Sequence, residues 1–135
     1  MKINIYLLFL LFFASSVNAQ TTLACQFTNS NGFTYEGGKW KRSGFLAEKP
    51  FFIKIKPNGI IDESSLKGVD MNFEPQCKRV YNYVAPELLI CYDTVKSLLL
   101  NIKTLEGAIS FLGGVALPNP TKDDMSISLF NCQSM

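Results

Sequence analysis

Four cysteines constrain this chain more than any other feature of its sequence. They stand at positions 25, 77, 91 and 132. An even number of cysteines in a small domain outside the cytoplasm is typical of a disulfide framework. Zinc would be the other use of four cysteines, but it prefers close pairs such as C-x2-C, and successive cysteines here are 52, 14 and 41 positions apart. We therefore expect two disulfides and no metal site.

Four cysteines allow three pairings, and we expect Cys77 with Cys91 and Cys25 with Cys132. The stretch Val84-Ala85-Pro86 lies between Cys77 and Cys91 and suits the turn of a hairpin. Cys25 and Cys132 lie near the two ends of the chain, and a first strand beside the last strand would close a barrel. The pairing therefore predicts that the ends of the domain meet in one sheet.

The first 19 residues predict export. A short basic start, Met1-Lys2, precedes an apolar run from Ile3 to Phe13, and Val17-Asn18-Ala19 has small side chains where a signal peptidase reads them. The run has about 11 residues, whereas a membrane-spanning helix needs about 20. We predict a cleaved signal peptide over 1–19, a single domain over 20–135 without a transmembrane segment, and a periplasmic or extracellular location.

The rest of the chain has the pattern of a β-protein. Residues 51–56, 97–103 and 125–129 alternate between apolar and polar side chains, as in strands with one face in water. Pro57-Asn58-Gly59 and Leu105-Glu106-Gly107 resemble hairpin turns with glycine at a positive φ angle. The sequence predicts an all-β domain, a small antiparallel β-barrel or sandwich of about eight strands stapled by two disulfides.

The last alternating segment conflicts with the cysteine pairing. In residues 125–129 the pattern places the apolar side chains in the core and the serines in solvent. Cys132 has the same strand parity as Ser126 and Ser128, so it would also face solvent. A β-bulge near Leu129-Phe130 is therefore required to bring Cys132 to the core.

One segment also supports a different fold class. On a helical wheel, one face at about 86–104 gathers apolar side chains, which are Leu88, Tyr92, Val95, Leu99 and Ile102. Pro86 suits a first helical turn and Gly107 suits a C-terminal stop. Against a helix, Ala85 is a poor N-cap, and the β-branched and aromatic content favours strands. We favour strands, and the alternative is an α+β fold.

The inventory of chemical groups disfavours catalysis. The chain has no histidine, which excludes Ser-His and Cys-His nucleophiles and histidine metal sites. Walker, dinucleotide-binding and EF-hand motifs are absent as well. The remaining catalytic candidates are carboxylate pairs, and Asp62-Glu63 and Asp123-Asp124 both lie in turn-like sequence. We expect no cofactor, no metal and no enzymatic activity.

One segment suggests binding. It is Lys39-Trp40-Lys41-Arg42, and residues 39–56 contain six basic residues against one acidic residue. A basic surface with an aromatic side chain suits an anionic envelope polymer or an acidic cleft of another protein. Nucleic acid is a weaker candidate because the net charge of the chain is only +2. The alternative is that these cations protect edge strands while Trp40 plugs the end of the core.

These features predict a small, monomeric, exported binding protein, such as an inhibitor or an immunity-type protein of the cell envelope or medium. The second hypothesis is an assembly or structural subunit that pairs through an exposed edge strand. The third is a carboxylate-dependent hydrolase.

Overall fold

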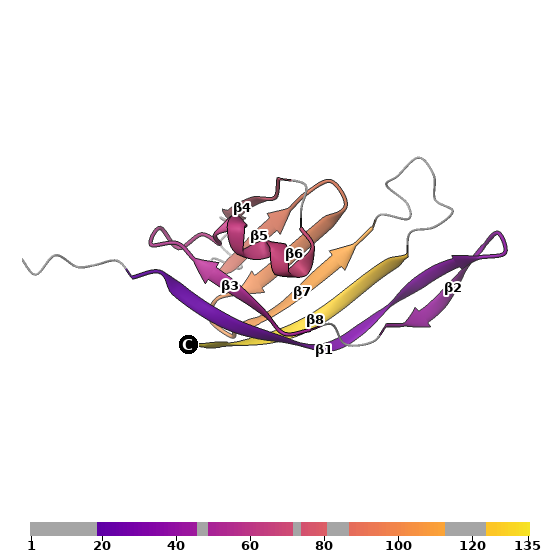
Figure 1. Cartoon of the computed structure of the whole chain (residues 1–135), viewed down its shortest axis with the longest axis horizontal. Helices are drawn as coiled ribbons and strands as arrows, with labels where there is room; N and C mark the ends of the chain where they lie inside the picture. The colour runs from indigo at the N-terminus through magenta and orange to yellow at the C-terminus, as the bar shows by residue number, and fades with distance from the viewer. Residues whose placement is uncertain (1–18, 46–48, 72–73, 81–86, 113–123) are drawn as a thin grey trace, which may run out of the picture.

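The computed structural model describes residues 19–45, 49–71, 74–80, 87–112 and 124–135. In these ranges the chain forms eight strands and one short 3-10 helix (Figure 1), namely β1 (Thr21–Glu36), β2 (Lys39–Gly44), β3 (Phe51–Ile55), η1 (Glu63–Val69), β4 (Gln76–Arg79), β5 (Leu88–Tyr92), β6 (Lys96–Asn101), β7 (Glu106–Phe111) and β8 (Met125–Ser134). The predicted signal peptide, apart from Ala19, lies outside the described residues. Within those ranges, no helix is long and apolar enough to cross a membrane.

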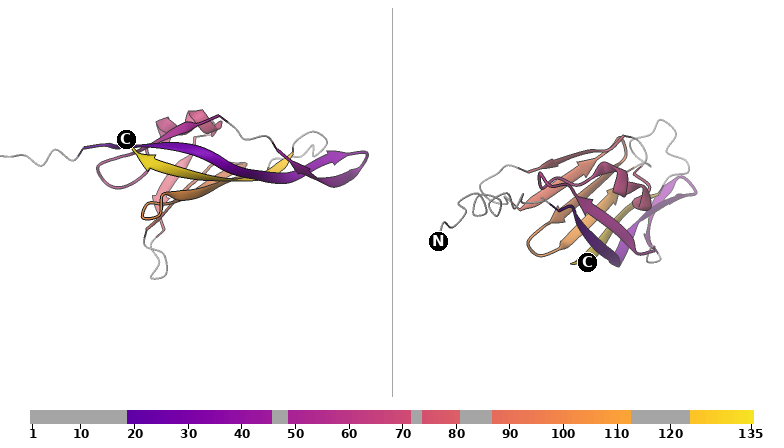
Figure 2. Two further views of the ribbon diagram at one scale, coloured as in Figure 1. Left: turned by 90° about the horizontal axis from the view of Figure 1, so that it is seen from below. Right: turned by 60° about the vertical axis from the view of Figure 1, so that its left-hand side comes forward.

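All eight strands belong to one antiparallel sheet, which confirms the predicted all-β class. The strand order is β2-β1-β8-β7-β6-β5-β4, and β3 also pairs with β1. The first half of β1 pairs with β3 and its second half with β2, while β8 pairs along most of its length. The sheet curls, and η1 and β3 lie on its concave side (Figures 1 and 2). The inner face of the sheet holds the core, and the outer face is uncovered by any other described element.

The alternative helix at about 86–104 is wrong. Residues 88–92 and 96–101 form β5 and β6, which pair in an antiparallel register. The Asp93 carboxylate accepts hydrogen bonds from the backbone N–H groups of Val95 and Lys96, and this local acceptor stabilises the turn between the strands. Every second residue is buried, namely Leu89, Cys91, Leu98 and Leu100. Burial in this segment therefore alternates with the period of two of a strand rather than with the period of a helix.

One of the two predicted glycine turns is correct. Gly59 has a φ angle of 77°, and its N–H donates to the carbonyl of Lys56 at 2.8 Å. The second turn lies earlier than predicted, because residues 102–104 turn and Leu105 takes the positive φ angle of 60°. Gly107 is a strand residue instead. A Cβ atom there would lie 2.2 Å from the Phe130 ring, so this position is a glycine because an aromatic ring packs on it.

Both disulfides join the predicted cysteines. Cys25 is bonded to Cys132 and Cys77 to Cys91. Each disulfide links residues that stand directly opposite one another in an antiparallel strand pair, in β1 and β8 and in β4 and β5. The first and last strands therefore lie side by side, as the pairing predicted.

The predicted bulge occurs at the step between Phe130 and Leu129 in the β1–β8 pairing, but in the partner strand, and the predicted inward face of β8 is wrong. The register shift lies in β1, between Phe27 and Asn29, while β8 alternates regularly. Ser128 is therefore buried with 3% of its surface exposed, whereas Ile127 is 56% exposed. The physical reason is that Cys132 and Phe130 face inward, and strict alternation then turns the serines in and the apolar residues out.

Candidate functional site

The β1–β2 hairpin extends away from the rest of the sheet (Figure 1). Glu36 pairs with Lys39 across a two-residue turn, and the turn residues Gly37 and Gly38 have φ angles of 59° and 79°. Two consecutive positive φ angles suit the right-handed twist of a tight hairpin, and glycine adopts them at no steric cost. Beyond Met125, where β8 begins, this hairpin is a two-stranded ribbon.

The structure divides the four predicted binding residues between the two faces of this ribbon. Trp40 and Arg42 stand opposite Tyr35 and Phe33, whereas Lys39 and Lys41 occupy the alternate positions. The Trp40 ring packs against Tyr35 with centroids 5.1 Å apart. Trp40 is half-buried and lies outside the core cluster, so the alternative in which it plugs the end of the core is wrong.

The two lysines on the other face have a different environment. The Lys41 ammonium lies 3.1 Å from the Glu36 carboxylate, and both side chains are well exposed. An exposed ion pair of this kind contributes little to stability, because water and salt screen it. The face with Trp40 and Arg42 is therefore the one that combines an aromatic pair with a cation.

That face continues into a shallow apolar groove on the outer side of the sheet. The groove has a volume of about 310 Å³, and its wall includes Phe33, Arg42, Leu112, Met125 and Ile127. Cross-strand pairing explains the grouping, because Phe33 stands opposite both Met125 and Arg42. The wall also includes Asn31, Gly32 and Ser126, and Arg42 is its charged residue.

The apolar surface extends past the groove across β8, β7 and β6. Strand register places Leu129 beside Ala108 and Ala108 beside Leu99 on the same outward face. We call this surface the outer apolar face and define it by Phe33, Tyr35, Trp40, Leu99, Leu112, Met125, Ile127 and Leu129. A contiguous exposed apolar surface of this kind is typical of an interaction site.

The charged residues on the outward positions of the strands are mostly basic. They are Arg42, Lys54, Lys78 and Glu106, by the strand registers. Arg42 lies within the groove wall, and the Lys78 ammonium lies 5.2 Å from the centre of the Tyr92 ring. The outer apolar face is thus flanked by cations on both sides.

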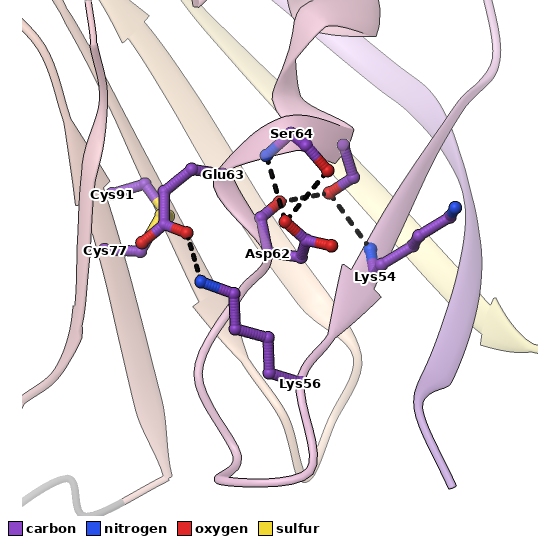
Figure 3. Close-up of a disulfide and its surroundings, with 8 residues drawn as sticks. Lys54, Lys56, Asp62, Glu63, Ser64, Cys77 and Cys91 are labelled. Atoms are coloured by element: carbon purple, nitrogen blue, oxygen red, sulfur yellow. Dashed lines mark hydrogen bonds and ion pairs between the residues drawn. A yellow bond between two sulfur atoms is a disulfide. The ribbon is translucent and has the colours of Figure 1, made fainter.

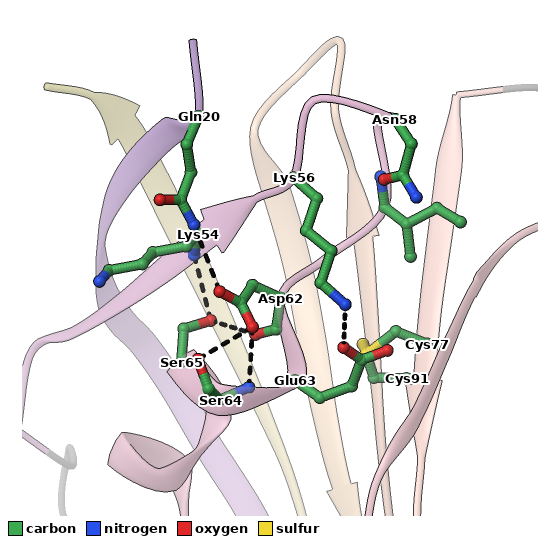
Figure 4. Close-up of polar contacts among 11 residues, drawn as sticks. Gln20, Lys54, Lys56, Asn58, Asp62, Glu63, Ser64, Ser65, Cys77 and Cys91 are labelled. Carbon is green, nitrogen blue, oxygen red and sulfur yellow. Dashed lines mark hydrogen bonds and ion pairs between the residues drawn. A yellow bond between two sulfur atoms is a disulfide. The ribbon is translucent and has the colours of Figure 1, made fainter. Parts of the chain in front are cut away.

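The predicted carboxylate pair Asp62-Glu63 lies elsewhere, at the start of η1 (Figures 3 and 4). Asp62 caps η1 by accepting hydrogen bonds from the Ser64 hydroxyl and N–H at 2.9 and 3.1 Å, and it also accepts one from Gln20 at 3.2 Å. The bonds from Ser64 hold the pKa of Asp62 below its ordinary value. A carboxylate in this position stabilises the first turn of a helix.

Glu63 forms an ion pair with Lys56 beside the Cys77–Cys91 disulfide (Figure 3). Burial raises the pKa of Glu63, but the hydrogen bond from Lys56, a backbone hydrogen bond and the charge of Lys56 together outweigh burial, and the pKa lies below its ordinary value. A general acid needs the opposite shift. Asp124 is half-buried, and its predicted partner Asp123 lies outside the described residues.

The described residues hold no group of three or more acidic, cysteine or histidine side chains placed to bind a metal ion. All four cysteines are in disulfides.

The sequence prediction missed the groove residues Phe33, Leu112, Met125 and Ile127. The sequence signal that identifies them is that Ser126, Ser128 and Cys132 lie an even number of positions apart, and therefore on the same face of one strand. If the disulfide faces inward and the strand is regular, then Met125 and Ile127 must face outward.

No protein-family model, curated protein or solved structure matches this chain.

Proposed function

We propose that this protein is an exported, non-enzymatic binding protein that holds a protein partner on its outer apolar face. One observation carries the proposal. Of the large hydrophobic side chains exposed in the described residues, all except Phe52, Tyr92 and Met135 belong to the outer apolar face, and these are Phe33, Leu99, Leu112, Ile127 and Leu129. Such an arrangement is costly in water unless a partner covers it.

The flanking charges indicate the chemistry of the partner. Arg42 lies in the groove and Lys78 lies beside Tyr92 on the same face. A partner with apolar side chains surrounded by carboxylates would complement both features, and charge complementarity would speed association. Lys39 adds a further positive charge at the hairpin, whereas Lys41 is paired with Glu36. A protein with an acidic rim fits this surface better than a purely anionic polymer, which would leave the apolar groove uncovered.

The remaining features agree with this proposal. Two disulfides are compatible with an oxidising, extracytoplasmic location. The hairpin buries no side chain beyond Ser30, and two-stranded ribbons are only marginally stable by themselves. A hairpin that adds little to the core is well placed to serve as a contact element.

The two other hypotheses have less support. Assembly through an edge strand requires an accessible edge, but the edge strands β2, β3 and β4 carry Lys39, Lys41, Arg42, Lys54, Lys78 and Arg79, and charges on edges oppose pairing. A hydrolase would need a free carboxylate pair. The Asp62 and Glu63 side chains are instead engaged by Ser64 and Lys56.

Site-specific photo-cross-linking tests the proposal. A photoreactive residue replaces Ile127, in the outer apolar face, and in a matched chain it replaces Lys67, which is exposed on η1 on the concave side. We expect the position-127 chain, exported in its native host, to form one dominant adduct that the position-67 chain does not form. Adding 0.5 M salt or replacing Arg42 with Ser should weaken this adduct, since the partner is acidic.

The adduct also separates the hypotheses. An adduct with a second copy of this chain would support the assembly hypothesis instead. Equal adducts at positions 127 and 67, or none at either, would contradict the binding proposal.

A further inference from the structure

A second cavity lies on the opposite, concave side of the sheet. It has a volume of about 280 Å³ and lies between the end of η1 and the inner positions of β6, β7 and β8. Its apolar wall is formed by Phe27, Val69, Ile109 and Phe111. Its polar groups are Lys96, Asp70, Ser126 and Ser128. The outer apolar face takes no part in it.

Ser128, in the wall of this cavity, belongs to a buried pair of hydroxyl groups. Ser128 donates to or accepts from Ser30 at 2.7 Å, and these two are the buried polar side chains in the described part of the chain. One hydroxyl hydrogen is used within the pair, so the accepting hydroxyl keeps its own hydrogen for another acceptor. A polar pair is costly in a core, and here Ser128 lines a cavity in which a ligand can use the remaining donor.

A cation stands in the same wall. The Lys96 ammonium donates to the carbonyl of Val69 at 3.1 Å and lies 5.6 Å from the centre of the Phe111 ring. An ammonium group has three donors, so two remain for a ligand. The strand register sets Lys96 opposite Phe111, and Phe111 opposite Ser126, so cation, aromatic ring and hydroxyl follow one another along a single inner row.

The other charge at the cavity is the carboxylate of Asp70, the residue that ends η1. Asp70 is exposed, whereas Lys96 is half-buried. Because water screens an exposed charge more strongly than a partly buried one, the field inside the cavity is dominated by Lys96.

We propose that this cavity binds a small monocarboxylate with an apolar body. The carboxylate accepts hydrogen bonds from the Lys96 ammonium and from the Ser128 hydroxyl, which in turn accepts one from Ser30. The hydrocarbon part packs on Phe27, Ile109 and Phe111. The volume lies near the lower end of the range of small-molecule sites, which limits the ligand to a short chain or one ring. This inference is independent of the partner proposed for the outer apolar face.

Titration of the purified, disulfide-bonded chain 20–135 with octanoate tests the inference. Octylamine and octanol serve as matched probes with the same hydrocarbon length and a cationic or neutral head. We expect octanoate to bind with one site and more tightly than octanol, and octylamine not to bind. Octylamine binding as tightly as octanoate would overturn the inference, as would the absence of octanoate binding to the folded chain.

Methyl resonances locate the bound probe. Octanoate should shift the methyl signals of Val69 and Ile109, which line the cavity, and leave those of Ile127 and Leu129 on the outer face unchanged. Shifts confined to Ile127 and Leu129 would mean binding to the outer surface and would overturn the inference.

Two variants test the polar groups. Lys96→Met keeps a long side chain over Phe111 without the charge, and it should weaken octanoate binding by about tenfold or more, since a charge-assisted hydrogen bond is lost. The control, Lys103→Met, lies in the exposed turn before β7 and should bind octanoate as the parent does. Ser30→Ala combined with Ser128→Ala should reduce the preference for octanoate over octanol. Equal octanoate affinity in the Lys96→Met chain and the parent would contradict the assigned head-group site.

Discussion

The pairing of β1 with β8 runs through two regions that differ in polarity. At one end the Cys25–Cys132 disulfide and the Phe27 and Phe130 rings fill the inner side. Phe51 joins them, with ring centroids 4.9 Å from Phe27 and 5.2 Å from Phe130. At the other end, beyond the register shift after Phe27, the inner side holds the hydroxyl pair and the outer side holds exposed apolar side chains.

The difference shows that one strand pair serves two purposes. We call the region with the disulfide the core end and the other region the hairpin end. The core end excludes water and stabilises the fold, as large buried side chains do. In the hairpin end the polar side chains face inward and the apolar ones outward, so the apolar side chains add little to the core and remain available for contact.

The largest expected effect concerns the two disulfides. The Cys25–Cys132 disulfide closes a loop with a sequence separation of 107, and the Cys77–Cys91 disulfide one of 14. Chain-entropy arguments give about 4.7 kcal/mol for a loop of about 100 residues and about 3 kcal/mol for one of about 15. Replacing Cys25 and Cys132 with Ala should therefore lower the free energy of unfolding more than replacing Cys77 and Cys91. Urea denaturation measures both, and the reverse order would contradict the importance of the core end.

Neighbouring residues of β8 give the next largest contrast. Phe130→Ala removes a ring from the core end and should cost about 3–5 kcal/mol. Leu129→Ala removes a side chain that is 49% exposed and should cost less than about 1 kcal/mol, because little buried surface is lost. Similar losses for the two variants in urea denaturation would contradict the inward and outward assignment of this strand.

A smaller effect is expected at the hairpin end. Trp40→Ala should cost about 1 kcal/mol, since the aromatic pair with Tyr35 is its main packing contact and such pairs contribute about 0.5–1.5 kcal/mol. Thermal unfolding of the variant measures this cost. A loss of several kcal/mol would show that the hairpin is part of the core after all.

The smallest effect is the pH dependence at η1. The pKa of Asp62 is held below its ordinary value of 3.8 by hydrogen bonds from Ser64. A lowered folded-state pKa adds stability that is present above the ordinary value and is lost as the pH falls through the folded value. Parent and Asp62→Asn chains, unfolded in urea at pH 7 and pH 3, should differ in this loss. Acidification should destabilise the parent more, and an equal loss would contradict a structural role for this carboxylate.

The core end could be predicted from sequence and the hairpin end could not. Cysteine spacing and position identified both disulfides and the meeting of β1 with β8, because covalent pairing leaves few options. In residues 125–129 local alternation predicts the wrong inward face. A pattern of period two separates the two faces of a strand but does not show which of them packs on the core. The buried Ser128 and the exposed Ile127 depend on Cys132, four and five positions away.

The binding residues show the same limit. The cluster Lys39-Trp40-Lys41-Arg42 was found by charge, but strand geometry assigns alternate residues to opposite faces. Leu112 and Met125 belong to one groove only because β7 and β8 pair across a long connection. Contacts between residues so far apart in sequence cannot be read from local composition.

If the hairpin end is a contact surface rather than a stabilising one, Ile127→Thr should weaken binding and leave stability unchanged. Threonine keeps the β-branched shape, so the free energy of unfolding should stay within about 0.5 kcal/mol of the parent value. With a cross-linker at Leu129 in both chains, the partner adduct should fall by about tenfold, because an apolar contact is lost. A destabilised Ile127→Thr chain that forms the adduct as well as the parent does would contradict the account.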